Sequence, residues 1–71
     1  MEYVMVIHQE PDGYSARFPD LPGCFTQADS LEELRENARE AVELYIEVLR
    51  DKGEPVPKPT ARIDKVAVKA S

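Results

Sequence analysis

A long amphipathic helix near the centre of this sequence limits what the remaining residues can form. Ser30 followed by Glu33 is a capping-box pattern, which predicts that the helix starts here. Gly53 and Pro55 predict that the helix spans residues 31–52 and ends there. The spacing of its apolar residues places them on one face: Leu31, Leu34, Ala38, Ala41, Val42, Tyr45, Val48 and Leu49.

Three short β-strands are predicted before the helix. In residues 2–10, Tyr3, Met5 and Ile7 alternate with Val4 and Val6. Apolar residues on both sides are typical of a central strand that is covered on both faces. A Pro-Asp-Gly turn follows, and the next five residues alternate as expected for the second strand of a hairpin.

Turn-forming residues separate the second strand from the third. Pro19 cannot donate to a strand ladder, and Pro22-Gly23 is a turn pair. Residues 24–28 are expected to form the third strand. Leu21 and Phe25 are expected to pin the intervening loop to the core.

A proline-rich connector and one more strand are predicted after the helix. Residues 53–60 contain three prolines and should be extended, and residues 61–69 are expected to form a fourth strand. The predicted fold class is α+β, with the order β-β-β-α-β in a single domain over residues 1–71. It combines a three-stranded antiparallel meander with one long helix. Because one helix covers one face of a sheet, we expect a homodimer or higher homo-oligomer, or a bound partner, to cover the second face.

Composition excludes several kinds of site. A single cysteine cannot form an internal disulfide, and one cysteine with one histidine makes a zinc site of the usual type implausible. No apolar run is long enough to span a bilayer and no signal peptide is recognisable, so we expect a cytoplasmic protein. The formal net charge is −5. An acidic chain argues against direct binding of nucleic acid and favours a basic protein partner.

The residue types that could carry catalysis have simpler interpretations. Cys24 lies near Asp20 and Asp29, whose negative charges oppose a reactive thiolate, so we interpret it as a buried structural residue. His8 near a strand end is interpreted as a surface or packed residue. We expect no enzymatic activity, no metal and no cofactor, although an enzyme using Cys24 or His8 remains an alternative.

Residues 13–59 resemble the HicB family of antitoxins. The resemblance is carried by the loop Pro19 to Cys24, by Thr26, by Ala28-Asp29-Ser30 before the acid-rich helix, and by Pro57-Lys58-Pro59. It implies a partial ribonuclease-H-like fold and a role in binding and masking HicA, a small basic toxin that cleaves mRNA. Members that regulate their own operon carry a C-terminal DNA-binding domain. We expect none here.

Two surfaces are candidates for contact with such a toxin. One is the loop, with Pro19, Asp20, Leu21 and Phe25, and the other is an acidic stripe on the helix. The stripe lies opposite the apolar face and comprises Glu36, Glu40, Glu43 and Glu47. The alternative function is an orphan oligomeric binding module without a toxin partner.

Overall fold

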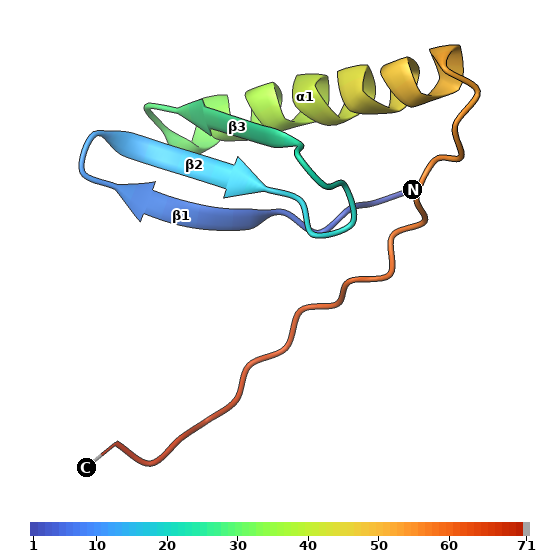
Figure 1. Ribbon diagram of the computed structural model, residues 1–71. Coiled ribbons are helices and arrows are strands. Elements are labelled where there is room, and N and C mark those ends of the chain that lie inside the picture. Colours follow the sequence, from blue (N-terminus) through green and yellow to red (C-terminus); the bar gives the residue numbers. More distant parts are fainter. Residues whose placement is uncertain (71) are drawn as a thin grey trace.

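A computed structural model describes residues 1–70 as a three-stranded sheet with one helix packed on it (Figure 1). The elements are β1 (Val6–Glu10), β2 (Gly13–Arg17), β3 (Phe25–Ala28) and α1 (Leu31–Asp51). The strands are antiparallel and lie in the order β1-β2-β3. This confirms the predicted small α+β domain up to the end of the helix.

The β1–β2 hairpin closes through a two-residue turn, because Glu10 pairs with Gly13 across Pro11-Asp12. Gly13 has φ +149°, and a Cβ there would lie 2.5 Å from the carbonyl oxygen of Ala28. The glycine therefore lets β2 approach the end of β3 more closely than any other residue would allow.

Both ends of α1 have the predicted caps. The Ser30 hydroxyl accepts a hydrogen bond from the backbone N–H of Glu33 at 3.2 Å. At the other end, Gly53 has φ +70°, and its N–H donates to Arg50 while Glu54 donates to Leu49. These two bonds form a Schellman motif, which ends the helix one residue earlier than predicted.

The core lies between α1 and the face of the sheet that carries Ala16. Leu21 and Leu34 are fully buried, one from the loop and one from the helix. The other buried apolar residues are Ala16, Phe18, Cys24 and Ala38. The structure therefore places the loop before β3 inside the core of the domain.

β1 is an edge strand, so the prediction of a central strand over residues 2–10 was wrong. The pair Val6–Arg17 is the last in the β1–β2 ladder, and the residues before Val6 have no strand partner within residues 1–70. The helix lies over β2 and β3 rather than β1. Consequently Ile7, on the same side of the sheet as Ala16, is 40% exposed.

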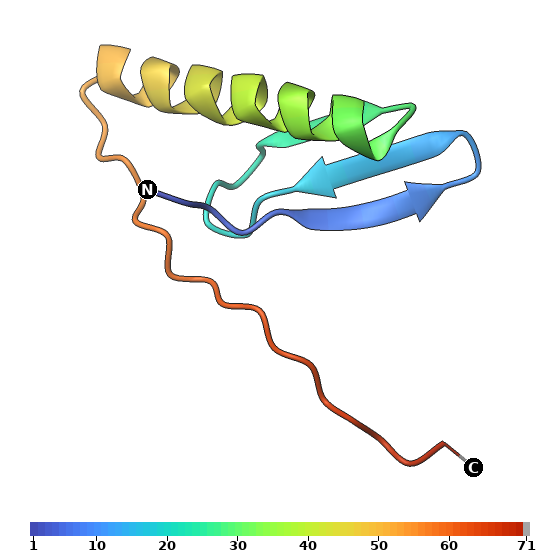
Figure 2. The ribbon, with the colours of Figure 1, turned by 180° about the vertical axis from the view of Figure 1, so that it is seen from behind.

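The predicted fourth strand over residues 61–69 was also wrong. Residues 54–70 contain no regular secondary structure, and in both views the last part of this stretch runs away from the sheet (Figures 1 and 2). The radius of gyration is 14.3 Å, against about 11 Å for a compact chain of this length. A strand needs a neighbour to accept its hydrogen bonds, and within residues 1–70 no strand pairs with this segment.

Candidate functional site

The loop between β2 and β3 is a rigid part of the candidate surface. Two successive turns close it, since Leu21 N–H donates to Phe18 and Cys24 N–H donates to Leu21, each at 3.0 Å. The Tyr45 hydroxyl of α1 donates to the carbonyl of Pro22 at 2.9 Å. The fully buried Leu21 therefore anchors the loop from inside, as predicted, and it is removed from the surface offered to a partner.

Asp20, next to Leu21, binds the C-terminal part of the same chain. Its carboxylate accepts hydrogen bonds from the Thr60 N–H at 3.1 Å, the Thr60 hydroxyl at 2.8 Å and the Ala61 N–H at 3.0 Å. The hydrogen bonds from Ala61 and Thr60 hold the pKa of Asp20 below its ordinary value. The Tyr3 hydroxyl donates to the Pro57 carbonyl nearby. Asp20 is therefore engaged within the chain, while Pro19 beside it is exposed.

Phe25 does not pin the loop to the core, contrary to prediction, because its side chain is 59% exposed. It borders an open hollow of about 510 Å³ between the loop and one flank of α1. Leu44 and Val48 line the helical side of the hollow and are 61% and 41% exposed. We call this the apolar hollow; its lining residues are Gly23, Cys24, Phe25, Ala41, Leu44, Tyr45, Val48, Leu49, Lys52 and Glu54.

The acidic stripe on the helix is solvent-exposed along its length, at Glu36, Glu40, Glu43 and Glu47. Glu40 precedes Leu44 by one helical turn, and Glu47 follows it by three residues, so both carboxylates neighbour Leu44 on the helix surface. The stripe and the apolar hollow thus form one continuous surface. The sequence pattern grouped Val48 with the apolar face of the helix, and it did not place Leu44 among the candidate contact residues.

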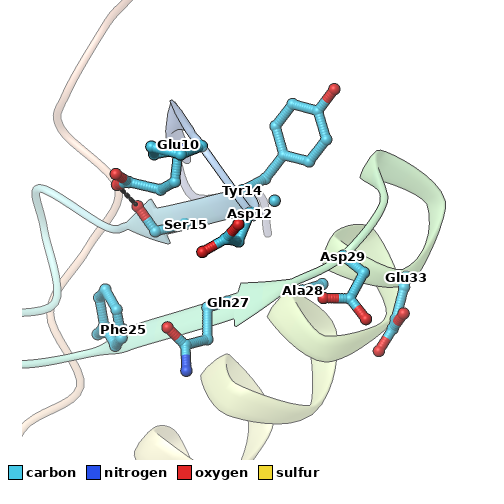
Figure 3. Close-up of a pocket in the computed structure, with 11 residues that line it drawn as sticks. Glu10, Asp12, Tyr14, Ser15, Phe25, Gln27, Ala28, Asp29 and Glu33 are labelled. Carbon is cyan, nitrogen blue, oxygen red and sulfur yellow. Dashed lines mark hydrogen bonds between the residues drawn. The ribbon is translucent and has the colours of Figure 1, made fainter.

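A second hollow, at the hairpin end of the sheet, is lined by acids and is shown in Figure 3. Glu10 and Asp12 come from the hairpin, and Asp29 and Glu33 come from the junction of β3 with α1. Ser15 donates to Glu10 at 3.0 Å. Nowhere in residues 1–70 do three or more potential metal-ligating side chains form a group that could hold a metal ion.

The surroundings of Cys24 and of His8 do not favour catalysis by either side chain. Cys24 is a buried free thiol, and desolvation raises its pKa, which disfavours the thiolate. His8 is exposed on the opposite face of the sheet from Ala16, where its strand partner is Ser15. The hydroxyl of this partner is itself engaged, because it donates a hydrogen bond to Glu10. The prediction that Cys24 is buried is confirmed.

The part of the chain that the structure describes contains no helix with the length and apolar character needed to cross a membrane.

Comparison with known proteins gives a consistent result for this fold and sequence. Residues 3–70 match the family described as HicB-like antitoxin of bacterial toxin–antitoxin system. A solved structure titled "HicA3 and HicB3 toxin-antitoxin complex" contains a chain with a TM-score of 0.74 and 33% identity. The match covers 84% of this chain and 70% of that one.

Two proteins of the UPF0150 group are similar over most of their lengths. One, from Archaeoglobus fulgidus, is 50% identical over 52 residues, which is 72% of this chain and 75% of the relative. Another, from Synechocystis, is 47% identical over 57 residues, covering 79% of this chain and 72% of the relative.

Proposed function

Because this chain belongs to the HicB-like antitoxin family, we propose that it binds and masks a small basic HicA-type toxin that cleaves mRNA. The chain acts as a protein partner and not as an enzyme. The structural similarity to a chain from a toxin–antitoxin complex supports this function. The observation that carries the proposal in this molecule is the continuous surface formed by the apolar hollow and the acidic stripe.

The apolar hollow supplies the contact area that such a complex needs. Phe25 projects from the start of β3, and Leu44 and Val48 project from α1 across the hollow. A cluster of aromatic and aliphatic side chains on a rigid support can anchor a protein interface. The support here is rigid because Tyr45 bonds the loop to the helix.

The acidic stripe supplies complementarity to a basic partner. Glu40 and Glu47 border the hollow, and Glu36 and Glu43 extend the negative charge along the helix. A toxin that binds RNA must present a basic surface to phosphates. In the complex, the carboxylates bind the basic surface of the toxin where the RNA backbone would bind. The apolar contacts in the hollow fix the orientation of the toxin, so its RNA-binding surface is masked.

Leu44→Asp tests the apolar hollow. The variant is expected to weaken binding of the HicA-type toxin of the host by at least about tenfold, because a charge would have to be desolvated in the interface. Titration calorimetry with purified toxin measures this, and inhibition of RNA cleavage measures masking. Leu31→Asp is the matched control, because Leu31 is a leucine of the same helix that is 37% exposed and lies outside both the hollow and residues 62–70. Equal affinity of Leu44→Asp and the wild type would contradict the assignment.

The double variant Glu40→Lys, Glu43→Lys tests the acidic stripe. It is expected to bind the toxin more weakly, and the loss should be largest at low salt because exposed charges are screened by ions. The control is Glu2→Lys, Asp12→Lys, which changes the net charge by the same amount at exposed sites away from the helix and from residues 62–70. An unchanged affinity would remove the stripe from the interface. Absence of any binding to a host toxin, with self-association only, would favour the orphan oligomeric module.

A further inference from the structure

The segment of residues 62–70 is exposed although its composition is that of a strand. Ile63, Val66 and Val68 are 74%, 86% and 80% exposed, the highest values among the large aliphatic residues after β1. Val66 and Val68 are two residues apart, which places them on one side of an extended chain. Single exposed apolar residues are common, but three in nine residues of unpaired backbone indicate a missing partner.

The free edge of β1 is the complementary feature. Within residues 1–70, β1 pairs only with β2, so its other edge has unpaired backbone N–H and C=O groups in the described chain. Residues 4–7, which span the start of β1, are apolar on both sides, with Val4 and Val6 on one and Met5 and Ile7 on the other. The helix lies over β2 and β3, which leaves both sides of β1 partly exposed.

We propose that residues 62–70 of one chain pair with the free edge of β1 in a second copy of this chain, and that the exchange is reciprocal. Each copy then gains a fourth strand from its partner. The exchange closes with two-fold symmetry, because each copy both donates and receives one strand. This inference does not depend on the toxin proposed above.

The connector explains why pairing occurs with a second copy and not within one chain. Three prolines stiffen residues 55–59. The hydrogen bonds of Asp20 to Thr60 and Ala61 then fix the point at which the segment leaves the domain. From that point the segment diverges from β1 in both views (Figures 1 and 2). Nine extended residues reach about 30 Å, which is enough to span a neighbouring strand.

Charge favours the same pairing. Residues 62–70 contain Arg62, Lys65 and Lys69 against Asp64, a net charge of +2, whereas residues 1–61 carry −7. Two such acidic domains repel each other unless positive charge lies between them. A basic segment that is donated by each copy to the other reduces this repulsion, so the attraction is electrostatic as well as apolar.

The test is the dimer dissociation constant, measured by sedimentation on the full chain over a range of micromolar concentrations. We expect a reversible dimer in the wild type. The variant Val66→Pro, Ala67→Pro should weaken the dimer by at least about tenfold, since alternate residues donate to a neighbouring strand and one of the two prolines must remove a donor. The control Val66→Thr keeps the amide and the side-chain shape, and should dimerise within a fewfold of the wild type. Neither site contacts the core, so the domain remains folded.

A second measurement distinguishes exchange from other occupants of the β1 edge. In a mixture of isotope-labelled and unlabelled chains, filtered NMR spectra should show contacts between residues 62–70 of one chain and residues 4–10 of the other. A monomeric wild type at all concentrations would overturn the proposal, as would a dimer that the proline variant leaves unchanged. Pairing of the segment with its own β1, or only with a toxin, would equally overturn it.

Discussion

The loop of residues 18–24 and the segment of residues 62–70 are both short apolar stretches beside prolines, and their burial is opposite. Leu21 in the loop is 0% exposed, whereas Val66 in the segment is 86% exposed. The loop closes on itself through local turns and is bonded to the helix by Tyr45. Within residues 1–70, the last hydrogen bonds between this part of the chain and the domain are those of Thr60 and Ala61 to Asp20, just before the segment.

Apolar side chains become buried only where a partner surface lies within reach of the chain. For the loop, that surface is α1, which follows a few residues later in the chain. For the segment, the free edge of β1 has the right chemistry, but the stiff connector directs the chain away from it. The two regions therefore predict different responses to the same kind of mutation.

The largest expected difference is in the free energy of unfolding. Leu21→Ala should lower it by about 2–5 kcal/mol, because the substitution leaves a cavity in a buried site, and in a domain this small the loss can abolish folding. Val66→Ala should change it by less than about 0.5 kcal/mol in dilute solution. Urea denaturation followed by helical circular dichroism measures both. Similar losses for the two variants would contradict the comparison.

Thiol labelling gives the next largest difference. In the variant Val66→Cys, the introduced thiol should react at least about tenfold faster than Cys24, which is buried and whose pKa is raised by desolvation. Mass spectrometry of peptides after timed alkylation of a dilute sample separates the two sites. In urea the two rates should become similar. Equal rates in the folded protein would mean that Cys24 is accessible, and would reopen the possibility of an active thiol.

The smallest effect concerns the point where the segment leaves the domain. The pKa of Asp20 is lowered in the folded state, so its bonds to Ala61 and Thr60 are intact above the ordinary carboxyl pKa of about 3.9. They are lost as the pH falls through the lowered value. The amide NMR signals of Thr60 and Ala61 should follow this titration, and in Asp20→Asn they should not. A midpoint at or above the ordinary value would contradict the bonding.

Much of the fold was predictable because its determinants are local. The turn at Pro11-Asp12, the Ser30 cap and the glycine at 53 each act within a few residues, and all three are present in the structure. The pattern of residues 61–69 favoured a strand equally well. That strand is absent because a strand also requires a neighbouring strand, and the sequence alone does not show in which direction the connector leads the chain.

The candidate surface was predicted only where local spacing along the helix determines it. The acidic stripe followed from helical spacing and is exposed as expected. Leu44, Val48 and Phe25 were not expected to form a hollow, because Phe25 precedes the helix and its position depends on how β3 packs against α1. The bond between Asp20 and Thr60 joins residues 40 positions apart, which no local pattern indicates.

The most direct test of the account is to map toxin binding onto the isotope-labelled chain by NMR. On addition of the unlabelled HicA-type toxin, we expect the signals of Phe25, Leu44 and Val48 and of the neighbouring glutamates to change, while those of residues 62–70 stay unchanged. Changes confined to residues 62–70, with the apolar hollow unaffected, would contradict the assignment of the hollow and the stripe as the toxin-binding surface.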